Sequence, residues 1–258
     1  MTPPDKSLDE LSPSEILNHV LAIGEGIKSL QAKATSVNER DSNRTKHSGR
    51  TIRVADDLYI ESRSRAPSKS EINRLPPEIR EQIAERVKAR SEILFYRGQT
   101  YCRLSAGGKW LSSDEYLADQ GISQNQVRQA EVRMPPGAYG IDPSTLSSIA
   151  RLPNETIEGR RFIRLSADFG LAGPDPFAGH PDSTSDRMLQ SAREHWRRTA
   201  PDRYGGKLDL WIGVDDLYIR QIKRVTYGYN QGRVLSSEET ITKYSRFNQA
   251  VLPGLLPD

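Results

Sequence analysis

Two tripeptides in this chain match fragments of motifs that carry out chemistry in other proteins. Asp168-Phe169-Gly170 spells the magnesium-binding triplet of protein kinases, but no glycine-rich loop, strand lysine or catalytic-loop motif accompanies it. Gly107-Gly108-Lys109 ends like a phosphate-binding loop, yet Arg103 stands where that motif requires its first glycine. We interpret both matches as chance.

Residues that bind metal ions or transfer protons are scattered along the sequence. Asp175, Asp182 and Asp186 do not follow the spacing of a calcium-binding EF-hand loop. The histidines offer no pair at ligand spacing on one helix face. They are His19, His47, His180 and His195. The sequence therefore predicts no metal, no cofactor and no catalytic residue, and an enzyme whose groups meet only in the folded chain is the minority hypothesis.

The single cysteine excludes an intrachain disulfide and a zinc site built from thiolates. Cys102 lies between Tyr101 and Arg103 in an expected strand. A thiol in that position is expected to be half-buried and structural, because a nucleophilic cysteine needs a group that lowers its pKa.

The charge balance argues against nucleic acid as a partner. Lysine and arginine number 37 against 34 aspartate and glutamate, and the net charge is +3. Binding to nucleic acid needs basic residues clustered on one face, whereas the densest basic run, Arg197-Arg198, is interpreted as a solvated helix end. With 258 residues and 35% hydrophobic content, the chain can form one large domain or two small ones.

Three amphipathic helices are expected to cover apolar surface elsewhere in the fold. The first has a complete start, with Ser12 as N-cap, Pro13 in the first turn and Glu15 closing a capping box. Its apolar stripe consists of Ile16, Val20, Ile23, Ile27 and Leu30. The others are residues 78–90, with Ile79, Ile83 and Val87, and residues 188–196, with Met188, Leu189, Ala192 and Trp196. A short fourth helix is expected after Asp142-Pro143, with Leu146, Ile149 and Leu152 inward.

The remaining elements are expected to be strands joined as hairpins. They fall at residues 32–40, 50–56, 58–64, 93–96, 100–104, 155–158, 160–167, 207–212, 217–229 and 233–247. Because strands do not alternate regularly with helices, an antiparallel sheet is favoured over a parallel one. The sequence Asp-Asp-Leu-Tyr-Ile occurs at residues 56–60 and again at 215–219, which we interpret as shared turn chemistry rather than duplication.

The C-terminal hairpins, residues 207–253, which we call the closing hairpins, contain a distinctive sequence motif. A strand with a central Trp211 and a short acidic turn precede Leu217-Tyr218-Ile219-Arg220-Gln221, and the end reads Tyr244-Ser245-Arg246-Phe247-Asn248-Gln249-Ala250-Val251-Leu252-Pro253. This text resembles the end of LppX/LprG-type bacterial lipoproteins and is similar to the wider lipoprotein-carrier (LolA/LolB-like) fold. The stretch from Tyr96 to Trp110 resembles the middle hairpin of the same family.

The resemblance implies an α+β fold, in which a strongly curved antiparallel sheet forms a half-barrel and helices pack on its concave face. We expect a flexible tether over residues 1–10 and a single domain over residues 11–258. The space between sheet and helices would hold a lipid or other hydrophobic small molecule, or would be filled by the core itself. No residue of such a site is named by the sequence.

By the same resemblance, the expected function is that of a non-catalytic extracytoplasmic lipoprotein domain that binds or carries a lipid. It would be attached to the membrane of the cell envelope by an N-terminal lipid anchor that this chain lacks, and we expect the signal peptide to have been trimmed. The alternative is an envelope sensor or interaction module on the same fold that binds a protein partner. A third hypothesis is an envelope hydrolase.

Overall fold

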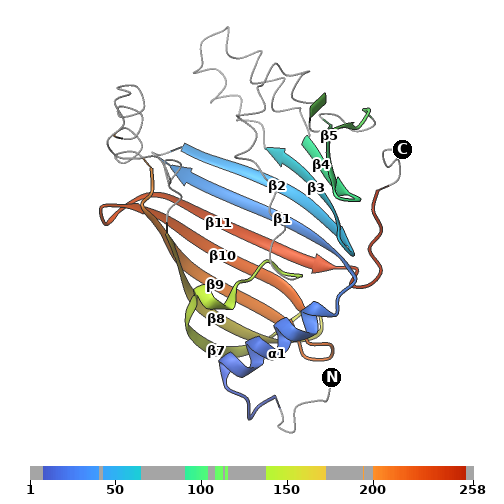
Figure 1. Cartoon of the computed structure of the whole chain (residues 1–258). Coiled ribbons are helices and arrows are strands. Elements are labelled where there is room, and N and C mark those ends of the chain that lie inside the picture. The colour runs from blue at the N-terminus through green and yellow to red at the C-terminus, as the bar shows by residue number, and fades with distance from the viewer. Residues whose placement is uncertain are drawn as a thin grey trace.

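The computed structural model describes residues 8–40, 43–64, 91–103, 108–112, 114–115, 138–172, 194 and 200–253. These residues form one helix of α type and an antiparallel sheet of 11 strands (Figure 1). No helix within these ranges is long and apolar enough to cross a membrane.

The strands follow one another as neighbours in two meanders. Their bounds are β1 Ser29–Arg40, β2 Asn43–Val54, β3 Asp57–Ser64, β4 Ser91–Tyr96, β5 Gln99–Arg103, β6 Leu111–Ser112, β7 Leu146–Ile157, β8 Arg160–Ala172, β9 Arg203–Gly213, β10 Ile219–Asn230 and β11 Arg233–Ser245. The order across the sheet is β6-β5-β4-β3-β2-β1-β11-β10-β9-β8-β7. The chain therefore runs outward from β1 to one edge, crosses to the other edge at β7, and returns so that β11 pairs with β1.

Two-residue turns fix the register of three hairpins. Arg97-Gly98, Glu158-Gly159 and Gln231-Gly232 all have positive φ at both positions, with glycine second. This is the type I′ turn, whose twist matches that of antiparallel strands, and glycine takes the second position without steric cost. The hairpins expected at these turns from the sequence are confirmed.

The helix α1 (Pro13–Glu25) begins as the sequence predicts. The Ser12 hydroxyl accepts a hydrogen bond from the Glu15 backbone N–H, and the Glu15 carboxylate accepts one from the Ser12 N–H at 2.7 Å. The backbone N–H groups of Ser12 and Glu15 would otherwise lack acceptors at the start of the helix, so the capping box stabilises α1 where it begins.

Replacing Ser12 by alanine is expected to lower the free energy of unfolding by about 1 kcal/mol, because the Glu15 N–H loses its acceptor. Chemical unfolding followed by tryptophan fluorescence measures the change. Ser14→Ala is the matched control, since Ser14 is exposed on the first turn of α1 and is expected to change stability by less than about 0.5 kcal/mol. Equal losses in the two variants would contradict the capping role.

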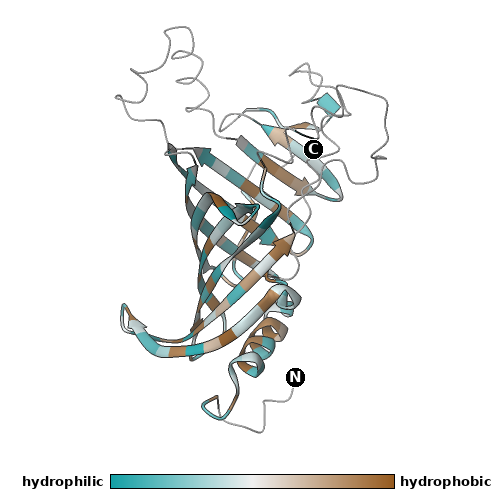
Figure 2. Ribbon diagram, turned by 90° about the vertical axis from the view of Figure 1, so that its left-hand side faces the viewer, coloured by the Kyte–Doolittle hydropathy of each residue, from teal (hydrophilic) through white to brown (hydrophobic). Residues whose placement is uncertain are grey.

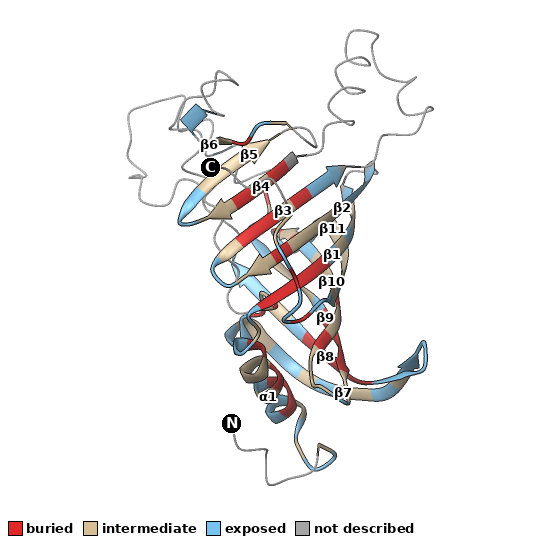
Figure 3. Ribbon diagram, turned by 90° about the vertical axis from the view of Figure 1, so that its right-hand side faces the viewer, coloured by how far each residue is buried: buried red, intermediate tan, exposed pale blue. Residues whose placement is uncertain are grey.

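The main hydrophobic core lies between α1 and one face of the sheet, which we call the α1 face. Residues paired directly across antiparallel strands point to the same face, so the register assigns each strand residue to a side. Ile16, Leu17 and Val20 of α1 are buried there, and Figure 3 shows the buried side of α1 turned to the strands. The sheet contributes Leu30, Ala32, Ile163, Leu165, Leu208, Leu210, Ile212, Ile219 and Ile222.

A second, smaller core lies on the opposite face, over β2 to β4. Ile52, Tyr59 and Leu94 are buried there beneath Trp110 and Ala250. Trp110 precedes β6 and Ala250 follows β11, so a strand connection and the C-terminal segment cover this part of the sheet. The sheet thus carries apolar cores on both of its faces.

The prediction of a helix that continues from Asp142-Pro143 through Leu152 is wrong. A short 3-10 helix, η2 (Pro143–Thr145), capped by Asp142, leads directly into strand β7. The register of β7 against β8 shifts between Ser147 and Ala150 and again between Leu152 and Glu155. These bulges bring Leu146 and Ile149 against the main core at a spacing that resembles a helix, which is why the sequence pattern misleads.

The antiparallel sheet is confirmed, and it is open, with β6 and β7 at the edges of the described strands. The helix expected at 78–90 and all of the one expected at 188–196 except residue 194 lie outside the described residues, so the packing of several helices on a concave face stays a prediction. So do the tether and the single domain. At the end of the expected tether, within residues 1–10, Leu8 packs against the main core and Asp9 pairs with Arg151 of β7 at 2.8 Å.

Candidate ligand-binding face

A strip of apolar side chains continues along the α1 face beyond the main core. Ala32 of the core pairs with Thr51, which pairs with Ile60, and from there the register runs without a shift through Ile93 to Cys102. All these side chains therefore point to the α1 face. The apolar strip consists of Leu58, Ile60, Ile93, Phe95, Cys102 and Leu111, on β3 to β6.

The apolar strip belongs to neither of the two cores formed by the described residues. Leu58 is buried, while Ile60, Ile93, Phe95, Cys102 and Leu111 are only half-buried. The intervening residues Tyr59 and Leu94 point to the opposite face and are fully buried. Figure 2 shows hydrophobic and hydrophilic residues interspersed along the strands of the sheet. Such a surface can bury further apolar area when a ligand covers it.

Cys102 is part of this strip and is half-buried, as expected from the sequence. Burial raises the pKa of its thiol, because the charged thiolate is disfavoured away from water. A reactive cysteine needs the opposite shift, so Cys102 has the properties of a structural thiol.

The part of the α1 face directly under α1 is filled by side chains. A Cβ added at Gly24 of α1 would lie 2.8 Å from the Tyr139 ring, so the helix and the ring are in close contact. The Tyr139 hydroxyl accepts a hydrogen bond from the Ile219 N–H at 3.2 Å, and the Tyr244 hydroxyl donates to the Tyr139 carbonyl at 3.3 Å. Burial raises the pKa of both tyrosines. Of the two arrangements left open by the sequence, this region shows the filled core.

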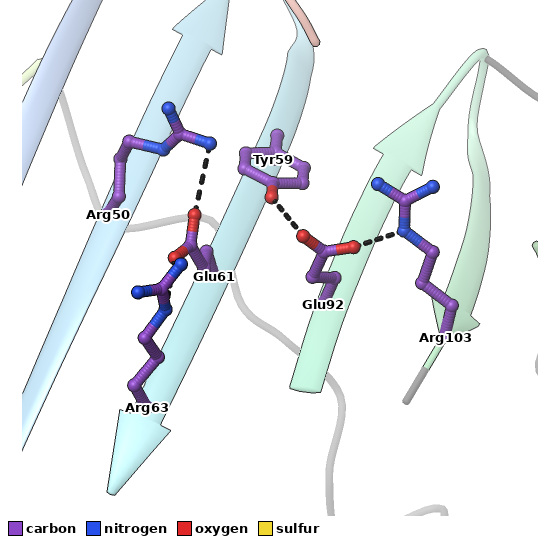
Figure 4. A network of polar contacts seen from close by, with 6 residues as sticks. All are labelled: Arg50, Tyr59, Glu61, Arg63, Glu92 and Arg103. Atoms are coloured by element: carbon purple, nitrogen blue, oxygen red, sulfur yellow. Dashed lines mark hydrogen bonds and ion pairs between the residues drawn. The ribbon is translucent and has the colours of Figure 1, made fainter. Parts of the chain in front are cut away.

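On the opposite face, a buried ion pair joins β4 to β5 (Figure 4). The Glu92 side chain is 0% exposed and pairs with Arg103, whose side chain is 9% exposed. The Tyr59 hydroxyl donates to the other Glu92 oxygen at 2.7 Å. The Arg103 guanidinium stands over the Trp110 ring, 4.2 Å from its centroid. Both carboxylate oxygens are thus bonded within the sheet, which fits a structural role rather than acid–base catalysis.

A second carboxylate in the same network bridges two arginines. Glu61 of β3 pairs with Arg50 of β2 at 3.0 Å and with Arg63 of its own strand at 2.8 Å (Figure 4). Its side chain is buried, whereas both guanidinium groups reach the surface. Sequence reasoning did not find these pairs. The two-residue turn at Arg97-Gly98 was the available signal for the ion pair of Glu92 and Arg103, because it places these two residues directly opposite each other.

The motif fragments weighed in the sequence do not come together as a site. Asp168 is exposed on β8 while its neighbour Phe169 packs against the main core. His19 is half-buried on α1 and His47 is exposed on β2. Gly107, His180, His195 and the three loop aspartates, Asp175, Asp182 and Asp186, lie outside the described residues. Within the described ranges, no group of three or more His, Cys, Asp or Glu side chains could hold a metal ion.

Comparison with protein-family models gives no match to this chain, and comparison with curated proteins gives none either. Solved structures do match. The fold is similar to that of LppX. This lipoprotein of Mycobacterium tuberculosis is 10% identical, with a TM-score of 0.44, and the match covers 93% of this chain and 97% of LppX.

Two further solved structures have similar chain paths. LprF from Mycobacterium bovis is 13% identical, with a TM-score of 0.44 over 95% of this chain and 96% of LprF. The MucA/MucB complex of Pseudomonas aeruginosa is 16% identical, with a TM-score of 0.33 over 95% of this chain and 58% of the matched chain. LppX, a lipoprotein of the type that the closing hairpins resemble, is thus among the similar structures.

Proposed function

We propose that this protein is a non-catalytic binding domain that holds a lipid or other hydrophobic ligand along the apolar strip. The observation that carries the proposal is the half-exposure of Ile60, Ile93, Phe95 and Leu111 on the face that elsewhere bears the main core. Apolar side chains in that position gain stability when a ligand removes them from water. Each acyl methylene buried against them contributes roughly 0.8 kcal/mol, so binding requires no catalytic group.

The setting of this function is the second part of the proposal. We infer that the domain works in the bacterial cell envelope, attached to the membrane by a lipid anchor. The support is the wording of the closing hairpins from Trp211 to Pro253. A carrier of this kind would take up its ligand reversibly, since apolar contact gives affinity without a covalent step.

Cys102, the single cysteine, provides a direct test because it lies on the apolar strip. Saturating palmitate is expected to slow alkylation of Cys102 at least fivefold, since a bound acyl chain covers the thiol. Mass spectrometry measures the rate of alkylation at alkaline pH, where the thiolate reacts. Ile93→Ser is expected to raise the palmitate concentration that gives half-maximal protection about tenfold. This change is equivalent to ~1.4 kcal/mol of lost apolar contact.

Val234→Ser is the matched control, because Val234 is 56% exposed on β11 and lies outside the apolar strip. Its palmitate protection should equal that of the unaltered chain. An organic extract of the purified protein should also contain lipid. Alkylation that palmitate does not slow, together with repeated extracts free of lipid, would overturn the proposal.

The second candidate is an interaction module that binds an envelope protein, and the edge strand β7 favours it. This strand has 12 residues and ends in exposed Thr156 and Ile157. An edge strand presents backbone N–H and C=O groups that a partner strand can pair with. Recovery of one stoichiometric protein partner without lipid would favour this candidate over lipid binding.

A further inference from the structure

An open groove of about 510 Å³ lies over β1, β2 and β3, and its charged side chains point to the face opposite the apolar strip. Polar and charged side chains line it, namely Lys33, Thr35, Ser48, Arg50, Glu61 and Arg63. Lys33 is directly opposite Arg50, and Thr35 is directly opposite Ser48, so the register brings these groups side by side.

The groove carries an excess of positive charge. Glu61 is the one carboxylate among the described lining residues and is shared between Arg50 and Arg63, while Lys33 adds a third cation. Lys33 also lies directly opposite Lys243 on its other side, in the β1–β11 pair. Like charges directly opposite each other across antiparallel strands repel, and an anion placed between them removes that repulsion.

Arg50, which lines the groove, also has a hydrogen-bond donor that is not used within the described residues. The Nε atom of Arg50 is buried and has no hydrogen-bond partner in the described part of the chain. The Arg50 guanidinium is held in place by Glu61 at 3.0 Å and by its position over the Tyr59 ring, 5.6 Å from the centroid. A guanidinium fixed in this way, next to hydroxyl groups and a lysine, matches the several acceptor oxygens of an oxyanion.

We propose that this groove is an anion-binding site that takes a phosphate group. Arg50 and Arg63 supply guanidinium donors, Lys33 supplies a mobile charge at the rim, and Thr35 and Ser48 supply hydroxyl donors. Glu61 orients the two arginines and does not face the phosphate oxygens directly. The site is independent of the apolar strip, because the two lie on opposite faces of the sheet. The phosphate is either a free anion or the headgroup of an anionic lipid at a membrane surface.

Two measurements on the whole chain distinguish these sources. Titration with inorganic phosphate, at ionic strength held constant with chloride, is followed by nuclear magnetic resonance of the arginine Nε–H groups. Co-sedimentation compares phosphatidylglycerol vesicles with phosphatidylcholine vesicles. A saturable shift of the Arg50 Nε–H signal with inorganic phosphate identifies a free-anion site. Binding only to phosphatidylglycerol vesicles, lost at high salt, identifies the lipid headgroup.

Substitutions in the groove test whether it is the site that binds phosphate or phosphatidylglycerol. Lys33→Gln is expected to weaken either interaction about fivefold, and Arg50→Gln is expected to weaken it more. Lys207→Gln removes the same charge from an exposed lysine on β9 and should leave binding within twofold. If Arg50→Gln unfolds, Lys33→Gln decides alone, since Lys33 is exposed. The proposal is overturned if neither phosphate nor phosphatidylglycerol binds, or if Lys33→Gln binds as well as Lys207→Gln.

Discussion

Replacing Arg103 by methionine is expected to lower the free energy of unfolding by about 3–5 kcal/mol, because the change removes the Arg103 guanidinium from a buried carboxylate. The Glu92 side chain is 0% exposed and forms an ion pair with Arg103, while its other oxygen accepts a hydrogen bond from the Tyr59 hydroxyl. Methionine fills much of the volume of arginine and keeps contact with Trp110, so the loss reports mainly on charge. Urea unfolding followed by tryptophan fluorescence measures it.

The double variant Glu92→Gln/Arg103→Met separates the charge from the packing. The glutamine carbonyl can still accept the hydrogen bond from Tyr59, and no buried charge remains. We therefore expect the double variant to regain at least half of the stability lost by Arg103→Met. A double variant no more stable than the single one would contradict the assignment of the loss to the buried charge of Glu92.

The exposed pair of Arg44 and Glu39 supplies the control for this prediction. Their side chains are 72% and 57% exposed, and the charged atoms are 3.4 Å apart. Solvent screens such a pair, so Arg44→Met should cost less than about 1 kcal/mol. The contrast between Arg103 and Arg44 is a contrast of burial, since both residues pair with a glutamate on a neighbouring strand.

The second large effect is expected at Gly206 of β9, which lies close against the backbone of β10. A Cβ at this position would lie 1.8 Å from the Val225 carbonyl oxygen and 2.9 Å from its carbon. Both are backbone atoms of β10 and cannot move aside as a flexible side chain could. Gly206→Ala is therefore expected to cost about 3 kcal/mol or more, because β9 and β10 must separate to admit the methyl group. Urea unfolding measures the loss.

Gly170→Ala is the matched control for this prediction. Gly170 lies on the adjacent strand β8 and is exposed, and a Cβ there would meet nothing within 4 Å. Its substitution should change the free energy of unfolding by less than about 0.5 kcal/mol. Similar unfolding midpoints for the two alanine variants would show that β9 can shift to admit a methyl group.

The elements that the sequence predicts well are those specified by neighbouring residues. The capping box at Ser12 and Glu15 sets the start of α1, and glycines 98, 159 and 232 mark turns whose register follows from two residues. The same logic places Glu92 opposite Arg103, although the pairing was not drawn from the sequence. In the folded chain Arg103 of this pair lies against Trp110, a contact that neighbouring residues in the sequence do not specify.

Two identical pentapeptides in this chain adopt different structures because their surroundings differ. Asp-Asp-Leu-Tyr-Ile at residues 56–60 follows a tight turn in which Val54 pairs with Asp57, so Leu58 already lies in β3. At residues 215–219, Leu217 has a positive φ and β10 begins only at Ile219. The Asp216 carboxylate accepts a hydrogen bond from the Tyr218 N–H at 3.1 Å, and Tyr218 stacks on Phe247. Tertiary contact therefore decides which turn forms.

The sequence by itself determined the start of α1, the hairpins and the antiparallel class of the sheet, because each depends on residues a few positions apart. Only the tertiary structure decided that β1 pairs with β11, that residues 146–157 form a bulged edge strand, and which face each strand residue occupies. Those features depend on burial shared between segments more than a hundred residues apart. The apolar strip and the basic groove arise from that same assignment of faces, so neither is visible as a motif in the chain.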